Sequence, residues 1–250
     1  MLRGWLAADV APPTFHIIDP VAENLPEGVQ LDRSSAALDT RFDIVILGIK
    51  PQLLAELAPE IARILAPGAT VISILAGTRT DTLSACFPDA RVIRLMPNLA
   101  AAIGKSPLGV FAPHDDAQQR AEMASLLAPL GAVIWIDEEV HMDAVTALAG
   151  SGPAFVYRFI DALSQGGEAA GLPRAIAAQL ALAMTEGAAI LAATSSETPT
   201  DLARRVTSPG GTTAAGLAVL DSDSALNILM TDTLRAARDR GAELAKGDAT

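Results

Sequence analysis

Short apolar runs alternate with longer amphipathic segments over the first half of the chain. The runs are rich in β-branched residues and lie at residues 15–18, 43–49, 70–75, 91–95, 108–111 and 133–136. Several are apolar almost throughout, as strands covered on both faces are. Between them, apolar residues recur at helical spacing over residues 52–57, 60–65 and 116–130. This alternation predicts an α/β domain over residues 1–138, with a parallel, doubly wound sheet covered by helices.

The second half of the chain has no such runs. From residue 138 to residue 246 the pattern predicts only helices, separated by Gly- and Pro-containing turns. Their Ala-rich apolar faces, as over residues 175–193, are larger than a lone helical domain of this size would bury. We therefore expect residues 139–250 to form an all-helical dimerisation domain, joined to the first domain without a flexible linker.

Charge and composition narrow the functional class. The chain has 18 Lys and Arg against 29 Asp and Glu, a net charge of −11, and no basic run longer than Arg204-Arg205. A nucleic-acid-binding surface would lack its counter-charge. The single cysteine, Cys86, permits no intramolecular disulfide, and the three histidines are far apart, so we expect a cytoplasmic protein without a metal site. No stretch reaches the ~18 uncharged apolar residues of a membrane span, so we expect no membrane partner.

Residues directly after the predicted strands are candidates for cofactor binding. In a doubly wound sheet, a dinucleotide lies at the carboxyl ends of the strands. Gly48-Ile49-Lys50-Pro51, Ala76 and Asn98 follow three of these strands. Asp19 follows the first strand, where a carboxylate would bind a ribose 2′-hydroxyl and favour NAD over NADP. Ordinary strand-to-helix turns and a solvated Asp-Pro turn explain the same residues equally well.

A glycine-rich phosphate turn is expected ahead of Asp19, but the 250 residues contain no G-x-G-x-x-G motif there. Residues 1–8 instead have the pattern of the helix that follows such a turn. We therefore expect the chain to start inside the dinucleotide-binding unit, without its first strand. Such a chain would bind dinucleotide weakly and would have a loosened N-terminal half.

The helical half contains two candidate ligand motifs. Residues 208–213, Ser-Pro-Gly-Gly-Thr-Thr, place two glycines and three hydroxyls at a predicted helix start. Free backbone N–H groups at such a start can hold a carboxylate. Residues 150–153, Gly-Ser-Gly-Pro, form a helix junction after an amphipathic turn. The alternative explanation for both motifs is that they are ordinary turns that end one helix and start the next.

In order along the chain, residues 48–52, 73–77, 94–98, 142–154 and 206–213 closely resemble pyrroline-5-carboxylate reductase, the last enzyme of proline biosynthesis. The resemblance implies a Rossmann domain that holds NADP or NAD, and a helical domain that forms an intertwined homodimer, often assembled into a decamer. It implies that residues 142–153 lie against the substrate ring and the nicotinamide. It assigns the cofactor to Gly48, Ile49, Lys50, Pro51, Ala76 and Asn98, and the substrate carboxylate to Ser208, Gly211, Thr212 and Thr213.

The implied reaction is hydride delivery to a C=N bond, for which placement of the reactants does most of the work. Thr213 is the candidate for hydrogen-bonding the imine nitrogen, and solvent is a candidate proton source. Asp19-Pro20 stands where many relatives have a polar or basic residue, which leaves the choice between NAD and NADP open.

Two other interpretations remain. A β-hydroxyacid dehydrogenase would carry a catalytic Lys one turn after the glycine-containing helix start, but residues 154–158 read Ala-Phe-Val-Tyr-Arg. An inactive oligomeric remnant would keep the helical interface and lack the nucleotide turn.

Overall fold

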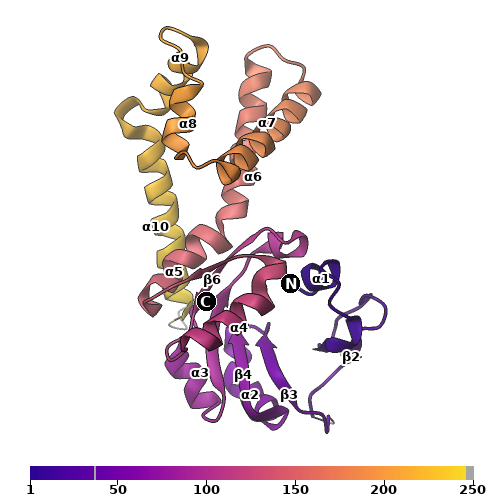
Figure 1. Cartoon of the computed structure of the whole chain (residues 1–250). Coiled ribbons are helices and arrows are strands. Elements are labelled where there is room, and N and C mark those ends of the chain that lie inside the picture. Colours follow the sequence, from indigo (N-terminus) through magenta and orange to yellow (C-terminus); the bar gives the residue numbers. More distant parts are fainter. Residues whose placement is uncertain (37, 246–250) are drawn as a thin grey trace. The chain divides into compact units, whose positions relative to one another are not determined.

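The computed structural model describes residues 1–36 and 38–245 (Figure 1). Contacts divide the chain into two units. The first comprises Met1–Ser151 together with the chain from Ala236 onward, and the second comprises Gly152–Arg235.

A five-stranded sheet forms the centre of the first unit. Its strands follow one another in chain order: β3 (Phe42–Leu47), β4 (Leu65–Ser73), β5 (Arg91–Met96), β6 (Ser106–Phe111) and β7 (Gly131–Trp135). The β3–β4, β4–β5 and β6–β7 pairs are parallel, as the apolar runs predict, but β6 runs antiparallel to β5. The expectation of a wholly parallel sheet is therefore wrong at this pair. Only residues 97–105 join β5 to β6, fewer than a parallel crossover needs.

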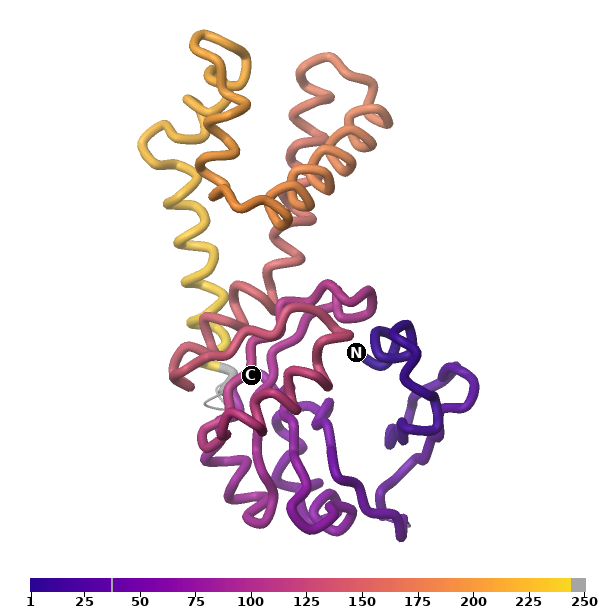
Figure 2. The backbone as a smooth tube through the Cα atoms, in the orientation of Figure 1, coloured from indigo at the N-terminus to yellow at the C-terminus, as the bar shows by residue number. Residues whose placement is uncertain are grey.

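A second, two-stranded parallel sheet contains β1 (His16–Ile18) and β2 (Gln30–Asp32). The strand order of a Rossmann sheet, 3-2-1-4-5-6, places the first strand between the second and the fourth. Here β1 and β3 would lie on either side of that strand, and no strand of the described residues pairs with both. Figure 2 traces the chain from one sheet to the other. Side chains still meet across this position, because the rings of His16 and Phe42 lie edge to face with centroids 5.2 Å apart.

Helices cover both faces of the five-stranded sheet, as its doubly apolar strands require. On β4, adjacent residues separate to the two faces: Ile72 belongs to one buried cluster and Val71 to the other. The two clusters include residues of α1 (Leu2–Ala7), α2 (Leu54–Arg63), α3 (Thr80–Cys86), η3 (Leu99–Ile103), α4 (Ala117–Leu127) and η4 (Ala128–Leu130). Two further short elements, η1 (Pro12–Thr14) and η2 (Pro51–Leu53), lie in the connecting segments.

The predicted helices are found with shifted ends. The segment predicted as helix over residues 60–65 stops at Arg63, because Leu65 already begins β4. The Asp116 side chain caps α4 by accepting a hydrogen bond from the Gln119 amide at 2.8 Å. The elements that were not predicted include the strand β2 and the helix α3.

Three short helical elements follow the sheet within the first unit. They are η5 (Glu139–His141), α5 (Met142–Val145) and the π-helix η6 (Thr146–Gly150). This stretch packs on β5 and β6: an added Cβ at Gly109 would collide with Val145, and one at Gly150 would lie 3.2 Å from the Met96 sulfur. The domain boundary expected near residue 138 therefore lies before the boundary between the two units, which follows Ser151.

All elements of the second unit are helices: α6 (Gly152–Ala169), α7 (Arg174–Thr194), α8 (Pro199–Arg205), α9 (Thr212–Leu220), η7 (Ser222–Ser224) and the first part of α10 (Ala225–Ala245). Among residues 152–235, only Ala177 and Ala181 are buried apolar residues. Large side chains such as Leu180, Ile190 and Leu191 are more than half exposed. One copy of this unit therefore has almost no core of its own, as the excess of apolar face predicts.

One helix of the second unit has the length and composition of a membrane span. By length and composition alone, α7 is apolar enough to cross a membrane, with a mean hydropathy of 1.6 over its best window. Its apolar stretch is not uncharged, since Glu186 lies in the interior of α7. Only 11% of that window is buried within the chain.

Candidate functional site

The carboxyl ends of β3, β4 and β5 lie at one edge of the sheet, because these strands are parallel neighbours. The predicted cofactor residues after β3 lie at this edge. Gly48 is exposed, and an added Cβ would meet no atom within 4 Å. Ile49 packs against the buried cluster beneath, Lys50 is exposed, and Pro51 begins η2. The turn therefore leaves room for a ligand beside Gly48, with one cation next to it.

Ala76 lies in the loop between β4 and α3 and is half-buried. The following residue, Gly77, has φ 74°, a left-handed conformation that glycine adopts without strain. This turn directs the loop across the same sheet edge toward Thr80, the first residue of α3.

Both polar atoms of the Asn98 side chain form hydrogen bonds within the protein. Its Oδ1 accepts a hydrogen bond from the Ala100 amide at 2.9 Å, which caps η3. Its Nδ2 donates to the Ala149 carbonyl at 2.9 Å. Asn98 thus lies at the expected edge, where it joins β5 to the π-helix η6.

Asp19 follows β1 as predicted and organises the turn after it. Its Oδ1 accepts hydrogen bonds from the Val21 and Ala22 amides, both at 2.8 Å. The Arg33 guanidinium donates to the Asp19 carbonyl at 3.3 Å and to the Ala22 carbonyl at 2.7 Å. The Asp-Pro turn is therefore present, and Asp19 Oδ2 has no protein partner among the described contacts.

A buried polar cluster beside this edge was not predicted from the sequence. Glu139 of η5 accepts hydrogen bonds from the Thr80 amide and hydroxyl at 2.7 and 2.8 Å and from Arg94 Nη1 at 2.9 Å. Arg94 is 3% exposed, and its Nη2 is buried without a hydrogen-bond partner. The available signal was an arginine inside the apolar run at residues 91–95, since buried charges are normally paired.

In the second unit, residues 208–213 form the start of α9. Gly210 has φ 71°, and the Gly211 amide donates to the Ser208 carbonyl at 3.0 Å. A side chain at Gly211 would collide with Ser208 Oγ. The first N–H groups of α9, from Thr212 and Thr213, have no partner within the helix. Hydroxyls and amides therefore gather at one helix start, as the motif predicts.

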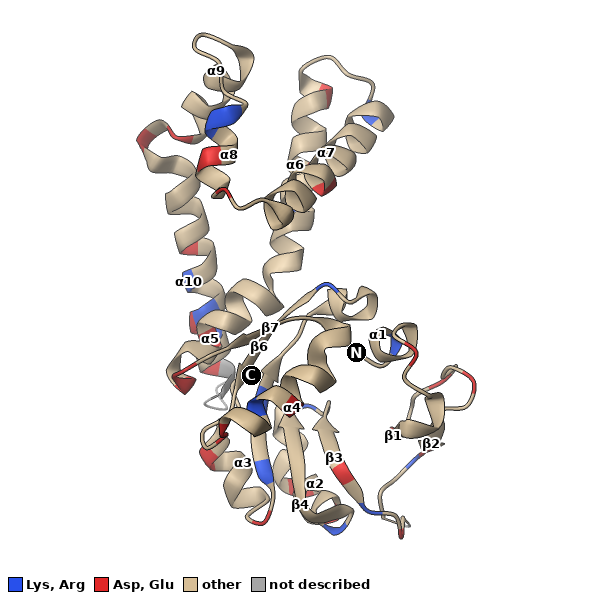
Figure 3. Cartoon of the chain, viewed as in Figure 1, with Lys and Arg blue, Asp and Glu red and all other residues tan. Residues whose placement is uncertain are grey.

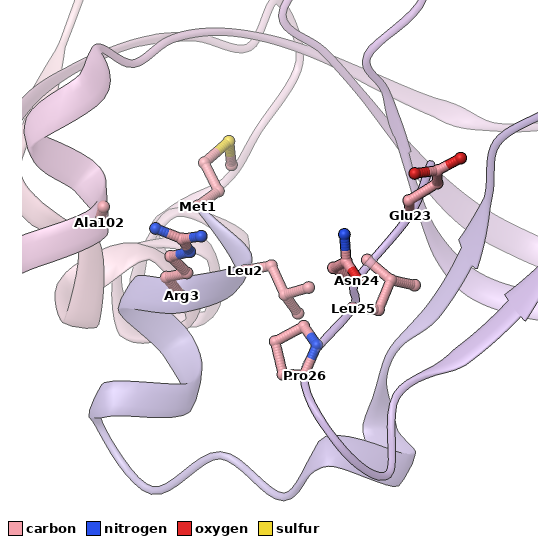
Figure 4. A pocket seen from close by; sticks show the side chains of 8 residues that line it. All are labelled: Met1, Leu2, Arg3, Glu23, Asn24, Leu25, Pro26 and Ala102. Atoms are coloured by element: carbon pink, nitrogen blue, oxygen red, sulfur yellow. The ribbon is translucent and has the colours of Figure 1, made fainter. Parts of the chain in front are cut away.

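The structure also has a pocket of about 460 Å³ in the first unit. Figure 4 shows its lining, which comes from α1, from the stretch between β1 and β2, and from Ala102 of η3. None of the predicted cofactor residues lines this pocket.

Charged groups supply few candidates for acid catalysis. Hydrogen bonds from the Thr82 amide and from the Thr198 hydroxyl lower the pKa of Asp81 and Asp201, respectively. The Asp81 carboxyl is exposed, the Asp201 carboxyl is partly exposed, and both are ionised at neutral pH, so neither donates a proton there. Figure 3 shows Lys and Arg interspersed with acidic residues along the ribbon. Within residues 1–36 and 38–245, no three His, Cys, Asp or Glu gather as metal ligands would.

Comparison with known proteins places the whole chain beside one enzyme family. A family model described as pyrroline-5-carboxylate reductase dimerisation matches residues 139–244. The pyrroline-5-carboxylate reductase of Pseudomonas aeruginosa is 34% identical, and the alignment covers 98% of this chain and 92% of that protein.

Solved structures of pyrroline-5-carboxylate reductases are also similar to this chain. A pyrroline-5-carboxylate reductase from Coxiella burnetii is 31% identical with a TM-score of 0.79, over 87% of this chain and 81% of that one. The pyrroline carboxylate reductase of Plasmodium falciparum, solved with NADP bound, has a TM-score of 0.82 over 97% of this chain and 92% of that one. At 23% identity, this second likeness concerns the fold.

Proposed function

This chain belongs to the pyrroline-5-carboxylate reductase family, and we propose on that premise that it reduces 1-pyrroline-5-carboxylate to L-proline with NADPH or NADH. The observation that carries the proposal is the identity of more than 30% over nine-tenths of a curated reductase. The β-hydroxyacid dehydrogenase and the inactive remnant are not favoured, because relatives aligned over nine-tenths of their length are named as pyrroline-5-carboxylate reductases.

The residues at the sheet edge fit the nicotinamide half of such a cofactor. Gly48 leaves its side of the turn open, and Ala76 and Asn98 follow the next two strands at the same edge. The cofactor supplies the hydride when bound. We assign Gly48, Ile49, Lys50, Pro51, Ala76 and Asn98 to its binding, and Asp19 to the ribose next to the adenine. A carboxylate there favours NADH, since it repels a 2′-phosphate.

We assign the substrate carboxylate to the start of α9. Ser208, Gly211, Thr212 and Thr213 present hydroxyls and amides there, where the positive end of the helix dipole stabilises an anion. The Thr213 hydroxyl hydrogen-bonds the imine nitrogen. Hydride is added to the imine carbon, the C=N π electrons pass to nitrogen, and a proton from solvent completes the amine.

The apolar surface of the second unit is best explained by a second copy of the chain. Its helices bury only two alanines by themselves, while α7 exposes Leu180, Ile190 and Leu191. We propose that residues 139–250 act as the dimerisation domain and residues 1–138 as the dinucleotide-binding domain. We further propose that five such dimers assemble into a decamer in the cytoplasm, with the face of α7 covered by protein and without a membrane or nucleic-acid partner.

A steady-state assay tests the activity. The purified 250-residue chain, and a version extended at its amino terminus by a β-strand and a glycine-rich turn, are mixed with 1-pyrroline-5-carboxylate and NADPH or NADH. Substrate-dependent loss of absorbance of the reduced cofactor is expected. Absence of this loss in both versions would contradict the proposed function.

A further inference from the structure

We propose that Glu139 is a positioning residue for the nicotinamide end of the cofactor site. Its carboxylate holds the β4–α3 loop, strand β5 and the start of the segment 139–150 in one arrangement. This inference rests on the proposed function, because it assigns a role within the same site. Sequence motifs do not single out this residue, since its partners lie far from it along the chain.

Both oxygens of the Glu139 carboxylate accept hydrogen bonds, and we call this carboxylate with its partners Thr80 and Arg94 the clamp. Oε1 accepts hydrogen bonds from the Thr80 amide at 2.7 Å and from Arg94 Nη1 at 2.9 Å, and Oε2 accepts from the Thr80 hydroxyl at 2.8 Å. Arg79 adds a longer ion pair at 3.8 Å. The side chains of Arg94 and Glu139 are only 4% and 11% exposed. The clamp is therefore largely shielded from water.

The partners of Glu139 belong to segments that approach the proposed cofactor. Thr80 ends the loop that begins at Ala76, and Arg94 lies on β5, four residues before Asn98. Glu139 itself begins the segment that ends in the π-helix η6. One carboxylate thus joins the β4–α3 loop, the end of β5 and the segment that the family resemblance places against the nicotinamide.

A second set of contacts fastens the far end of the same segment. Asn98 Nδ2 holds the Ala149 carbonyl, and Gly150 packs against the Met96 sulfur so closely that a methyl group there would lie 3.2 Å from it. The segment is therefore held to β5 at both ends, by Glu139 at its start and by Asn98 at its finish. The second anchor lies within the π-helix η6, an element of the kind often found at functional sites.

Charge explains why a carboxylate is needed at this position. Arg94 Nη2 has no hydrogen-bond partner, so Glu139 is the carboxylate that compensates the buried guanidinium among the described residues. A buried ion pair adds little stability relative to apolar side chains of the same volume, whereas loss of one partner leaves a charge uncompensated. The pair therefore selects one arrangement of the three segments more than it adds stability.

The test compares Glu139→Gln with Glu138→Gln, which removes the same charge from the exposed neighbouring residue. Because Glu139 contacts only segments on the nicotinamide side, kcat is expected to fall about 10- to 100-fold, the effect of a displacement near 1 Å. The dissociation constant of NADPH or NADH, measured by fluorescence, is expected to rise in parallel. The KM for 1-pyrroline-5-carboxylate is expected to stay within about twofold, and Glu138→Gln to match the unaltered chain in all three.

Further measurements separate positioning from folding. Far-UV circular dichroism checks that Glu139→Gln is folded; if it is not, Glu139→Asp, which keeps the charge, is measured instead, with a smaller fall in kcat expected. An unchanged kcat and cofactor affinity, or an equal rise in the KM of both substrates, would overturn the proposal.

If neither the unaltered chain nor the version extended at its amino terminus turns over or binds the cofactor, the proposed function fails, and hydrogen exchange then decides on positioning. Residues 76–80 and 142–150 are expected to exchange about tenfold faster in Glu139→Gln than in Glu138→Gln. Equal rates of hydrogen exchange in the two variants would overturn the proposal that Glu139 holds these segments in place.

Discussion

Asn98 and Ala149 are joined by a hydrogen bond of 2.9 Å from the side-chain amide of the first to the backbone carbonyl of the second. Asn98 ends the stretch after β5, and Ala149 lies in the π-helix η6, so the bond crosses between segments that are 51 residues apart in the chain. The same side chain caps η3 through Oδ1. A residue predicted to bind the cofactor therefore also holds the edge of its own site together.

Asn98→Asp tests this structural role. The carboxylate still accepts from the Ala100 amide, but it cannot donate to the Ala149 carbonyl and brings an oxygen against it. We expect the free energy of unfolding to fall by about 1–3 kcal/mol, the cost of an unmade hydrogen bond. Urea denaturation measures it. Asn227→Asp, at an exposed position of α10, is the control; equal losses from both variants would remove the Asn98–Ala149 bond as a cause.

Thr213→Ala tests the proposed contact with the imine nitrogen. Loss of one hydrogen bond to a group that gains charge should lower kcat/KM by about 1–3 kcal/mol equivalent. Thr200→Ala, at an exposed position in α8, should leave kcat/KM unchanged. A similar small effect from both substitutions in steady-state assays would place Thr213 outside the site.

Gly211→Ala tests the carboxylate site at the start of α9. The new methyl group would collide with Ser208 Oγ, so the helix start must shift and the KM for the substrate should rise about tenfold, as for loss of one hydrogen bond to a charged group. Gly216→Ala places the same methyl group in the same helix, where no atom lies within 4 Å. A Gly216→Ala effect as large as that of Gly211→Ala would show that α9 responds to any added methyl group.

Strong local patterns made most of the sheet predictable. Strands β3, β5 and β7 coincide with apolar runs to within two residues at each end, because the runs are rich in the β-branched residues that a pleated sheet favours. β2 was missed because its three residues, Gln-Leu-Asp, contain one apolar side chain. α3 was missed because Thr80–Cys86 is rich in residues of low helix propensity, and the helix is held by burial of Leu83 and Phe87.

Candidate site residues could be predicted where they form a motif of neighbouring residues in the sequence. They could not be predicted where residues far apart in the sequence come together only in the fold. Residues 208–213 read as a helix start, and the structure begins α9 at Thr212. The position of Glu139 was hidden, because it meets Arg94 from 45 residues away. The antiparallel direction of β6 was equally hidden, since apolar runs carry no information on strand direction.

Association through the helical unit is tested with Ile190→Lys, on the exposed face of α7. The side chain is 57% exposed in one copy. If a second copy covers it, a buried Lys charge should weaken the dimer, and sedimentation velocity should show a smaller species. Ile134→Lys, at a 49% exposed position on β7, should leave the oligomer intact. An unaltered chain that sediments as a stable monomer, or that is recovered only with membranes, would contradict the proposal.

The last prediction concerns the sheet edges on either side of the unfilled position. β3 pairs with β4 on one side, and β1 pairs with β2, but within the described residues no strand pairs with the other edge of either. Their outward amides therefore depend on water or on side chains for hydrogen bonds. We expect hydrogen exchange in residues 43–47 and 16–18 to be at least about tenfold faster than in β4 and β5, because amides on an unpaired edge open with little of the global unfolding free energy. Mass spectrometry of peptides from the 250-residue chain measures this. Equal protection of β3 and β4 would mean that the two sheets close against each other in solution without an intervening strand.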